Sequence, residues 1–143
     1  FKKPDKQIKN LKLNIMNTEK YNEISGKILH ASIEVHKEMG PGLLEAVYEY
    51  CLCKELNSAG LEAVNQYMLP LYYKGENLHK DFRIDILVEN KILVEVKAVE
   101  NLLPVHEAQV ISYLKMANLK LGLLINFNVP MIKQGFRRFV NGL

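Results

Sequence analysis

The strongest constraint on the fold comes from two apolar segments, residues 82–88 and 92–97, which are separated by only three residues. Their composition and this short separation predict two antiparallel strands joined as a hairpin. With Asn90 in the left-handed conformation that three-residue loops often need, one face of the hairpin becomes entirely apolar. The pairs on that face are Val88 with Ile92, Ile86 with Val94, and Ile84 with Val96. A two-residue loop would set Asp85 opposite Val96 and bring charge into this face, so burial favours the longer loop.

The other face of the predicted hairpin brings two carboxylates together. Asp85 lies opposite Glu95, with their Cβ atoms about 5 Å apart, and Lys97 follows Glu95 by two positions on the same face. Two acids this close repel each other unless a cation lies between them. A hard divalent cation such as Mg²⁺ prefers oxygen ligands, so this face predicts half of a metal site. The alternative is a solvent-exposed face on which the acids form salt bridges with Arg83 and Lys97, and the spacing alone leaves both open.

Composition restricts the class of protein without naming a function. The chain has 143 residues, of which 48% are hydrophobic and 24% charged, as expected for one globular domain and not for a disordered or collagen-like chain. No apolar stretch is long enough to cross a bilayer, so no membrane partner is expected. Cys51 and Cys53 lie two apart in a predicted helix and point away from each other. This argues against a disulfide and structural zinc, and favours a reducing compartment, the cytoplasm.

The predicted elements indicate an α/β fold, a mixed sheet flanked by helices in the order ααβββαβα. The predicted helices cover residues 22–39, 43–59, 106–117 and 131–140. The predicted strands cover residues 61–73, 78–88, 92–99 and 121–127. On the last helix, Lys133, Arg137 and Arg138 are interpreted as a solvated basic patch.

The positive charge is unevenly distributed along the chain. Residues 1–20 hold six lysines against two acids, a balance of +4, whereas the remaining residues balance to −1. We therefore expect a flexible basic tail over residues 1–20 and a single domain over residues 21–143. Because that domain is not basic overall, a nucleic-acid partner would have to be met by a local patch or by the tail.

The order of these elements, with Asp85 on one strand and Glu95-Val96-Lys97 on the next, resembles the PD-(D/E)XK nuclease superfamily. The sequence of residues 42–48, Gly-Leu-Leu-Glu-Ala-Val-Tyr, is similar to the name-giving motif of one branch, the GxxExxY family. Three further runs also resemble that family, residues 35–41, 102–109 and 122–130, so the resemblance covers about residues 21–142. One departure is Ile84, which stands where the superfamily's name has proline.

The resemblance implies a restriction-endonuclease-like fold that hydrolyses phosphodiester bonds in nucleic acid with Mg²⁺ or Mn²⁺, with DNA the favoured substrate. It implies that Asp85 and Glu95 are metal ligands, with Glu45 as an additional acid and metal ligand. It also implies that Lys97 positions or activates the attacking water and stabilises the developing negative charge. For Glu45, the alternative is a first-turn acid that interacts favourably with the helix dipole.

Three further residues are predicted to bind substrate. Gln109 and Tyr113 lie four apart on one helix face and resemble the Gln-x-x-x-Tyr element of RecB-like nucleases, the alternative being a core tyrosine bonded to a glutamine. Tyr48 shares the face of Glu45, and its alternative is a packing role. His36 and His106 are interpreted as structural or solvated more readily than as part of a site.

A different function remains open for this chain. It is a catalytically silent module that uses the same fold to bind nucleic acid or protein, and the slightly acidic charge of the domain keeps this alternative open. The oligomeric state is left open, with a homodimer as one option.

Overall fold

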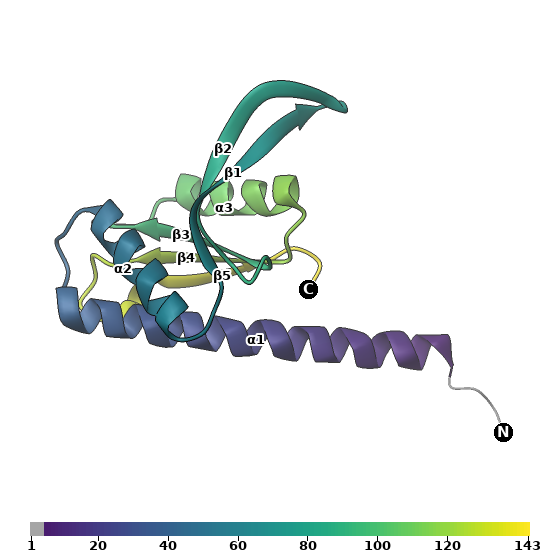
Figure 1. Ribbon diagram of the computed structural model, residues 1–143, viewed down its shortest axis with the longest axis horizontal. Helices are drawn as coiled ribbons and strands as arrows, with labels where there is room; N and C mark the ends of the chain where they lie inside the picture. The colour runs from purple at the N-terminus through teal and green to yellow at the C-terminus, as the bar shows by residue number, and fades with distance from the viewer. Residues whose placement is uncertain (1–4) are drawn as a thin grey trace.

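A mixed five-stranded sheet organises the computed structural model, which describes residues 5–143 (Figure 1). The helices are α1 (Lys6–Met39), α2 (Glu45–Ser58) and α3 (Pro104–Ala117), with a short 3₁₀ helix η1 (Ile132–Gly135). The strands are β1 (Ala63–Tyr73), β2 (Glu76–Val88), β3 (Ile92–Lys97), β4 (Leu121–Asn126) and β5 (Phe136–Val140). They lie in sequence order, and only β3 and β4 are parallel. The predicted α/β class with a mixed sheet flanked by helices is confirmed.

Helices cover both faces of this sheet (Figure 1). The larger core lies on the side of α1 and α2, where Ile28, Leu52 and Val94 are fully buried. The smaller core lies under α3 and contains Val110 and Leu124. Within residues 5–143, no helix is both long and apolar enough to span a membrane.

The predicted register of the β2–β3 hairpin is confirmed where the two strands are paired. Ile86 pairs with Val94, Leu87 with Leu93 and Val88 with Ile92. The loop between them has three residues, and two of these adopt positive φ, Glu89 (53°) and Asn90 (54°). The length and the left-handed residue of the loop, which set the register of the hairpin, were therefore predicted correctly from the sequence.

The predicted apolar face breaks at its outer end. Ile84 was expected beside Ile86, but Ile84 belongs to the core under α3 whereas Ile86 belongs to the core under α1 and α2. The break occurs at Asp85, which lies beside Gln66 of β1 with its left-handed φ of 54°. This irregularity interrupts the alternation of faces, so that expectation for Ile84 is wrong.

The first helix begins earlier than its predicted start at residue 22. Helix α1 already begins at Lys6, and Asp5 caps it by accepting a hydrogen bond from the Gln7 amide at 3.0 Å. Residues 6–20 contain Lys, Leu, Gln, Glu and Met, which form helices well, and no Gly or Pro, and their side chains are largely exposed. The chain is thus helical through this part of the predicted tail, whose residues 1–4 lie outside the described ones.

The prediction of a last helix over residues 131–140 is wrong. Residues 132–135 form the η1 turn, and residues 136–140 form β5, which pairs antiparallel with β4. The sequence Phe-Arg-Arg-Phe-Val has good strand propensity, and pairing along β4 satisfies its backbone. Because successive strand residues point to opposite faces, Arg137 and Arg138 cannot form one patch.

Candidate functional site

Two carboxylates replace backbone pairing at the point where the β2–β3 ladder stops. One oxygen of Asp85 accepts a hydrogen bond from the Val96 amide at 2.9 Å. In return, Oε1 of Glu95 accepts one from the Asp85 amide at 3.3 Å. The predicted neighbours Asp85 and Glu95 are therefore brought together, and each carboxyl takes an amide from the opposite strand.

Glu95 is the most buried acid of this group, with only 4% of its surface exposed. Burial, and then the nearby charge of Asp85, raise the pKa of Glu95 to about 9 from an ordinary 4.5. The positive charge of Lys97 lowers the pKa of Glu95, but this effect is smaller than those of burial and Asp85. A cation between these acids would relieve the repulsion that the raised pKa reflects.

Lys97 and Glu45 meet across the junction between the sheet and α2. The Nζ atom of Lys97 lies 4.0 Å from Oε1 of Glu45, and the lysine side chain is only 18% exposed. Lys97 is the last residue of β3, and Glu45 is the first residue of α2. A positive charge is thus held beside the Asp85–Glu95 pair at the end of the strand.

A small hollow of about 230 Å³ adjoins Asp85 on the α2 side. It is lined by Glu45, Ala46, Glu49, Gln66 and Asp85. The side-chain amide of Gln66 donates to Oε1 of Glu49 at 2.6 Å. Burial, together with the Asp85 charge, raises the pKa of Glu49 to about 7.

Glu49 and Gln66 are members of this group that sequence reasoning missed. Glu49 lies one helical turn after Glu45, so a shared helix face was the signal that could have found it. Gln66 had no comparable signal, because its place depends on a left-handed residue within β1.

The predicted pair on α3 is in contact. The amide of Gln109 donates to the Tyr113 hydroxyl at 2.7 Å, and the Tyr113 ring stacks on Phe82 at 4.3 Å between centroids. Burial raises the pKa of Tyr113, and the charges of Glu95 and Asp85 add to the rise while Gln109 opposes it. Tyr113 thus lies within electrostatic range of the two acids.

Tyr48 is placed in the larger core, on the side of α1 and α2. It is fully buried and stacks on Phe127 with 4.7 Å between ring centroids. Its hydroxyl donates to the Gly40 carbonyl and accepts from the Leu43 amide, and so fixes the turn that leads into α2. That turn requires positive φ at Gly40 (67°), which glycine adopts without steric cost. These contacts match the packing alternative for Tyr48.

Asn126, at the end of β4, holds the backbone that follows Lys97. Its amide donates to the Val99 carbonyl at 2.9 Å, and its side-chain oxygen accepts from the Val99 amide at 3.0 Å. The Phe127 amide also donates to the Lys97 carbonyl at 2.9 Å. The parallel neighbour strand therefore fixes the position from which Lys97 projects.

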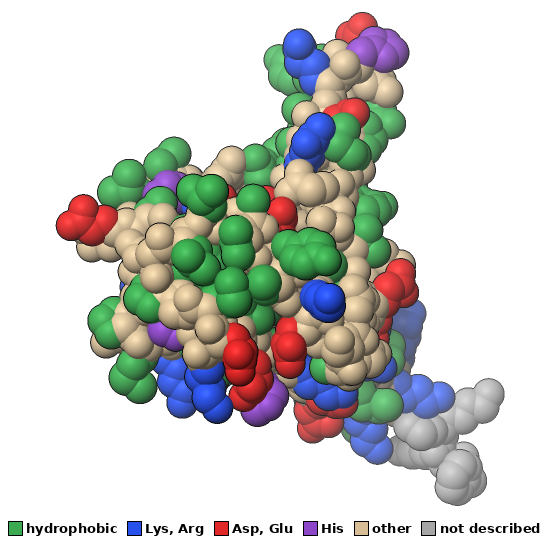
Figure 2. All heavy atoms as spheres, turned by 60° about the vertical axis from the view of Figure 1, so that its left-hand side comes forward, with side chains coloured by type: hydrophobic (Ala, Val, Ile, Leu, Met, Phe, Trp, Pro, Cys, Tyr) green, Lys and Arg blue, Asp and Glu red, His purple; other side chains and the backbone are tan. Residues whose placement is uncertain are grey.

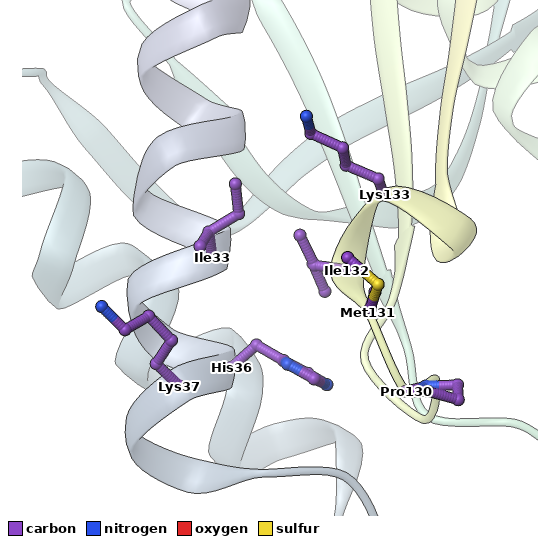
Figure 3. A pocket seen from close by; sticks show the side chains of 7 residues that line it. All are labelled: Ile33, His36, Lys37, Pro130, Met131, Ile132 and Lys133. Carbon is purple, nitrogen blue, oxygen red and sulfur yellow. The ribbon is translucent and has the colours of Figure 1, made fainter.

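A second pocket, of about 290 Å³, lies apart from these acids between α1 and the segment before β5 (Figure 3). Its lining is mostly apolar and contains none of the predicted site residues. His36 projects into it, and its Nε2 lies 2.8 Å from the Val129 carbonyl. His106 uses Nδ1 to accept from the Leu103 amide at 3.0 Å at the start of α3. Both histidines thus have structural contacts.

A divalent metal needs several oxygen donors around one point. Within residues 5–143, no three His, Cys, Asp or Glu side chains gather closely enough to enclose an ion, so Glu45 does not complete a triad with Asp85 and Glu95. Mg²⁺ needs less than this, since one or two carboxylates with waters and substrate phosphate commonly hold it. Asp85 and Glu95 supply two hard oxygen donors, which fit Mg²⁺ or Mn²⁺ as a partial shell.

Comparison with known proteins identifies the family. A family model described as the PD-(D/E)XK nuclease superfamily matches residues 22–139, a span that includes the whole acid and lysine group. The chain belongs to the PD-(D/E)XK nuclease superfamily. Comparisons with curated proteins and with solved structures gave no significant match. Membership of the PD-(D/E)XK superfamily points to nuclease-like hydrolysis of phosphodiester bonds as the chemistry of this fold.

Proposed function

We propose that this PD-(D/E)XK protein hydrolyses phosphodiester bonds in nucleic acid, with DNA as the first substrate to test. The observation that carries the proposal is the meeting of Asp85, Glu95 and Lys97 at the end of the paired β2–β3 ladder. The similarity of residues 42–48 to the GxxExxY motif supports assignment to that branch.

Asp85 and Glu95 are the proposed ligands of Mg²⁺ or Mn²⁺. When bound, such an ion supplies Lewis-acid polarisation of a phosphoryl oxygen. One carboxylate oxygen of each acid already accepts a backbone amide, which fixes the orientation of both carboxyl groups before any ligand arrives. This preorganisation supports a binding role for the second oxygen of each.

Lys97 is the proposed electrostatic catalyst. Its ammonium group is mostly buried beside the acids, where a charge acts more strongly than in water, and it would stabilise the negative charge that develops on the phosphate. Glu45, 4.0 Å away, orients this ammonium, and its proposed effect on the metal site acts through Lys97 and not as a third ligand. Glu49, whose pKa is raised to about 7, is suited to exchanging a proton near neutral pH.

Gln109 and Tyr113 are the proposed substrate contacts on α3. Their mutual hydrogen bond holds the tyrosine hydroxyl in place, and the hydroxyl retains a proton to donate to a phosphate oxygen. The raised pKa of Tyr113 keeps that proton bound at neutral pH.

The test is cleavage of a panel of labelled single- and double-stranded DNA and RNA, with Mn²⁺ and with EDTA. We expect cleavage that needs the metal and falls on the order of 100-fold or more in Lys97→Met, which keeps the apolar stem and removes the charge. Lys115→Met removes an exposed lysine near the end of α3 and should leave the rate unchanged. Equal rates for wild type and Lys97→Met would overturn the role of Lys97.

The catalytically silent alternative is favoured by one observation. Both acids already serve the sheet as hydrogen-bond acceptors, so a protein without turnover would still use them. Binding of nucleic acid with no metal-dependent cleavage of any substrate in the panel would support this alternative.

A further inference from the structure

The β1–β2 pair continues far beyond the acids as a two-stranded ribbon that stands away from the sheet (Figure 1). Pairing extends from Tyr67 with Ile84 to Tyr73 with Glu76 at the tip. The paired segment of β1 from Tyr67 to Tyr73 corresponds to roughly 23 Å of extended strand. The strand that presents Asp85 therefore also forms a long arm.

The two faces of this ribbon have different surroundings. One face is packed on α3, where Leu69 and Phe82 join the smaller core. The other face begins at Gln66 and Asp85, which line the hollow beside α2. Next along it, Met68 lies directly opposite Arg83 on the partner strand.

The pairing register shifts between Pro70 and Tyr72, and the extra residues of this irregularity lie on β2. Along β1 itself the alternation continues, so Tyr72 lies farther out on the same face as Met68. Tyr73 has the opposite orientation, with the ammonium of Lys74 at 5.5 Å from its ring centroid. The two tyrosines are almost equally exposed, at 62% and 61%. Only the Tyr72 face is continuous with the acids.

The exposed side chains of this face combine a cation with apolar and aromatic groups. Arg83 is two residues from Asp85, about 7 Å along the strand, which suits a phosphate next to the one at the acids. Residues 67–83 hold three basic and two acidic side chains and one histidine, a balance of only +1. Figure 2 shows Lys or Arg side chains spaced along the projecting arm, with apolar groups between them.

This weak charge separates two kinds of nucleic-acid binding. Duplex binding depends mainly on many Lys and Arg contacts to phosphates, which the arm does not offer. Single strands are bound by cations along the backbone together with aromatic rings on which unpaired bases stack, and the exposed Arg83 and Tyr72 offer one group of each kind. The arm matches the second pattern.

We propose that the β1–β2 ribbon binds single-stranded nucleic acid and leads it to the Asp85–Glu95 pair. Arg83 binds a phosphate beside the scissile one, and Met68 and Tyr72 contact unpaired bases farther along. This inference rests on the proposed function, which it deepens by naming the substrate as single-stranded.

The test is binding of the full chain to fluorescein-labelled 20-nucleotide single-stranded DNA, to RNA of the same sequence and to the DNA duplex. Fluorescence anisotropy is read in EDTA, where hydrolysis does not contribute. We expect single strands to bind more tightly than the duplex, and Tyr72→Ser to weaken single-strand binding about fivefold or more. Tyr72→Phe keeps the ring and should bind as wild type does. The matched control Tyr73→Ser should change affinity less than twofold, since it lies on the other face.

Arg83→Gln gives an independent measurement. It should weaken binding and lower the slope of log affinity against log salt by about 0.7, the value for one lost phosphate contact on a single strand. The inference is overturned if Tyr72→Ser binds no more weakly than Tyr73→Ser, or if wild type prefers the duplex. It is also overturned if sedimentation shows a dimer that Tyr72→Ser dissociates, because the face would then bind a second copy. Single-strand binding without any cleavage in Mn²⁺ would support this inference and count against the hydrolysis.

Discussion

The ammonium of Lys97 lies 4.0 Å from the carboxylate of Glu45, so the end of β3 and the beginning of α2 meet at an ion pair. Glu45 is half exposed, and such pairs contribute little to stability. The pair is therefore better explained by orientation of Lys97 than by support of the fold.

Replacement of Glu45 by Gln tests this explanation. We expect the free energy of unfolding to change by less than about 1 kcal/mol. The Mn²⁺ concentration needed for half-maximal cleavage should rise on the order of 10-fold, as for loss of a group that positions a metal site. Denaturant titration and metal-dependent kinetics measure the two effects, and Glu38→Gln, an exposed acid in α1, is the control. An unchanged metal requirement would remove Glu45 from the site.

Asp85 is expected to have separable structural and ligand roles. Asp85→Asn keeps an oxygen that can accept the Val96 amide, so most stability should remain while metal binding is lost. Asp85→Ala leaves that amide without its acceptor, and should cost about 1–3 kcal/mol more than the Asn variant. Urea denaturation of both variants measures the difference, and calorimetry with Mn²⁺ measures the binding. Equal stabilities would show that the hydrogen bond contributes nothing to folding.

The metal-free protein should lose stability as pH rises. The folded state raises the pKa of Glu49 to about 7 and that of Glu95 to about 9, from an ordinary 4.5. Between pH 4.5 and pH 9 the folded chain therefore holds more protons than the unfolded chain. The free energy of unfolding is highest below about pH 4.5 and falls as pH rises toward 9.

Chemical denaturation in EDTA at several pH values measures this decline. Glu95→Gln should flatten it over the whole range, whereas Glu49→Gln should flatten only the part below about pH 7. A free energy of unfolding that increases from pH 5 to pH 9 would contradict the expected protonation of these acids.

Tyr48→Phe should separate packing from substrate binding. The hydroxyl bonds to Gly40 and Leu43 would be lost, with a cost of about 1–3 kcal/mol. Below the melting temperature, kcat/KM for cleavage should stay within about twofold of wild type, because the hydroxyl faces the turn into α2 and not the acids. Thermal unfolding and initial rates are the measurements. A large loss of activity in a stable variant would return Tyr48 to the substrate site.

Local patterns predicted the parts of the fold that local chemistry decides. The β2–β3 register follows from a three-residue loop and from burial of Ile86 and Val94, both visible in the sequence. The contact between Gln109 and Tyr113 follows from helical spacing alone. In each case, the interacting residues lie within ten positions of each other.

The rest depended on distant partners. Residues 136–140 became a strand because β4 offers an edge to pair with, a preference that a short sequence window does not contain. Gln66 contacts Glu49 because Gln66 itself adopts a left-handed conformation within β1. At the same irregularity, Ile84 packs in the core under α3 and not in the core of Ile86. Asp85 and Glu95 were placed together correctly, yet their exchange of backbone amides depends on where the ladder stops.

The use of these two carboxylates as hydrogen-bond acceptors for the sheet has an evolutionary consequence. A descendant without nuclease activity would still need acceptors for the Val96 and Asp85 amides. Natural selection for a stable fold would then keep an acceptor oxygen at positions 85 and 95, which asparagine and glutamine also supply, long after selection for turnover had ended. Lys97 differs, because its ammonium pairs with the Glu45 side chain, whereas each acid accepts a backbone amide. Its replacement would therefore be the first sequence change to show that catalysis had been lost.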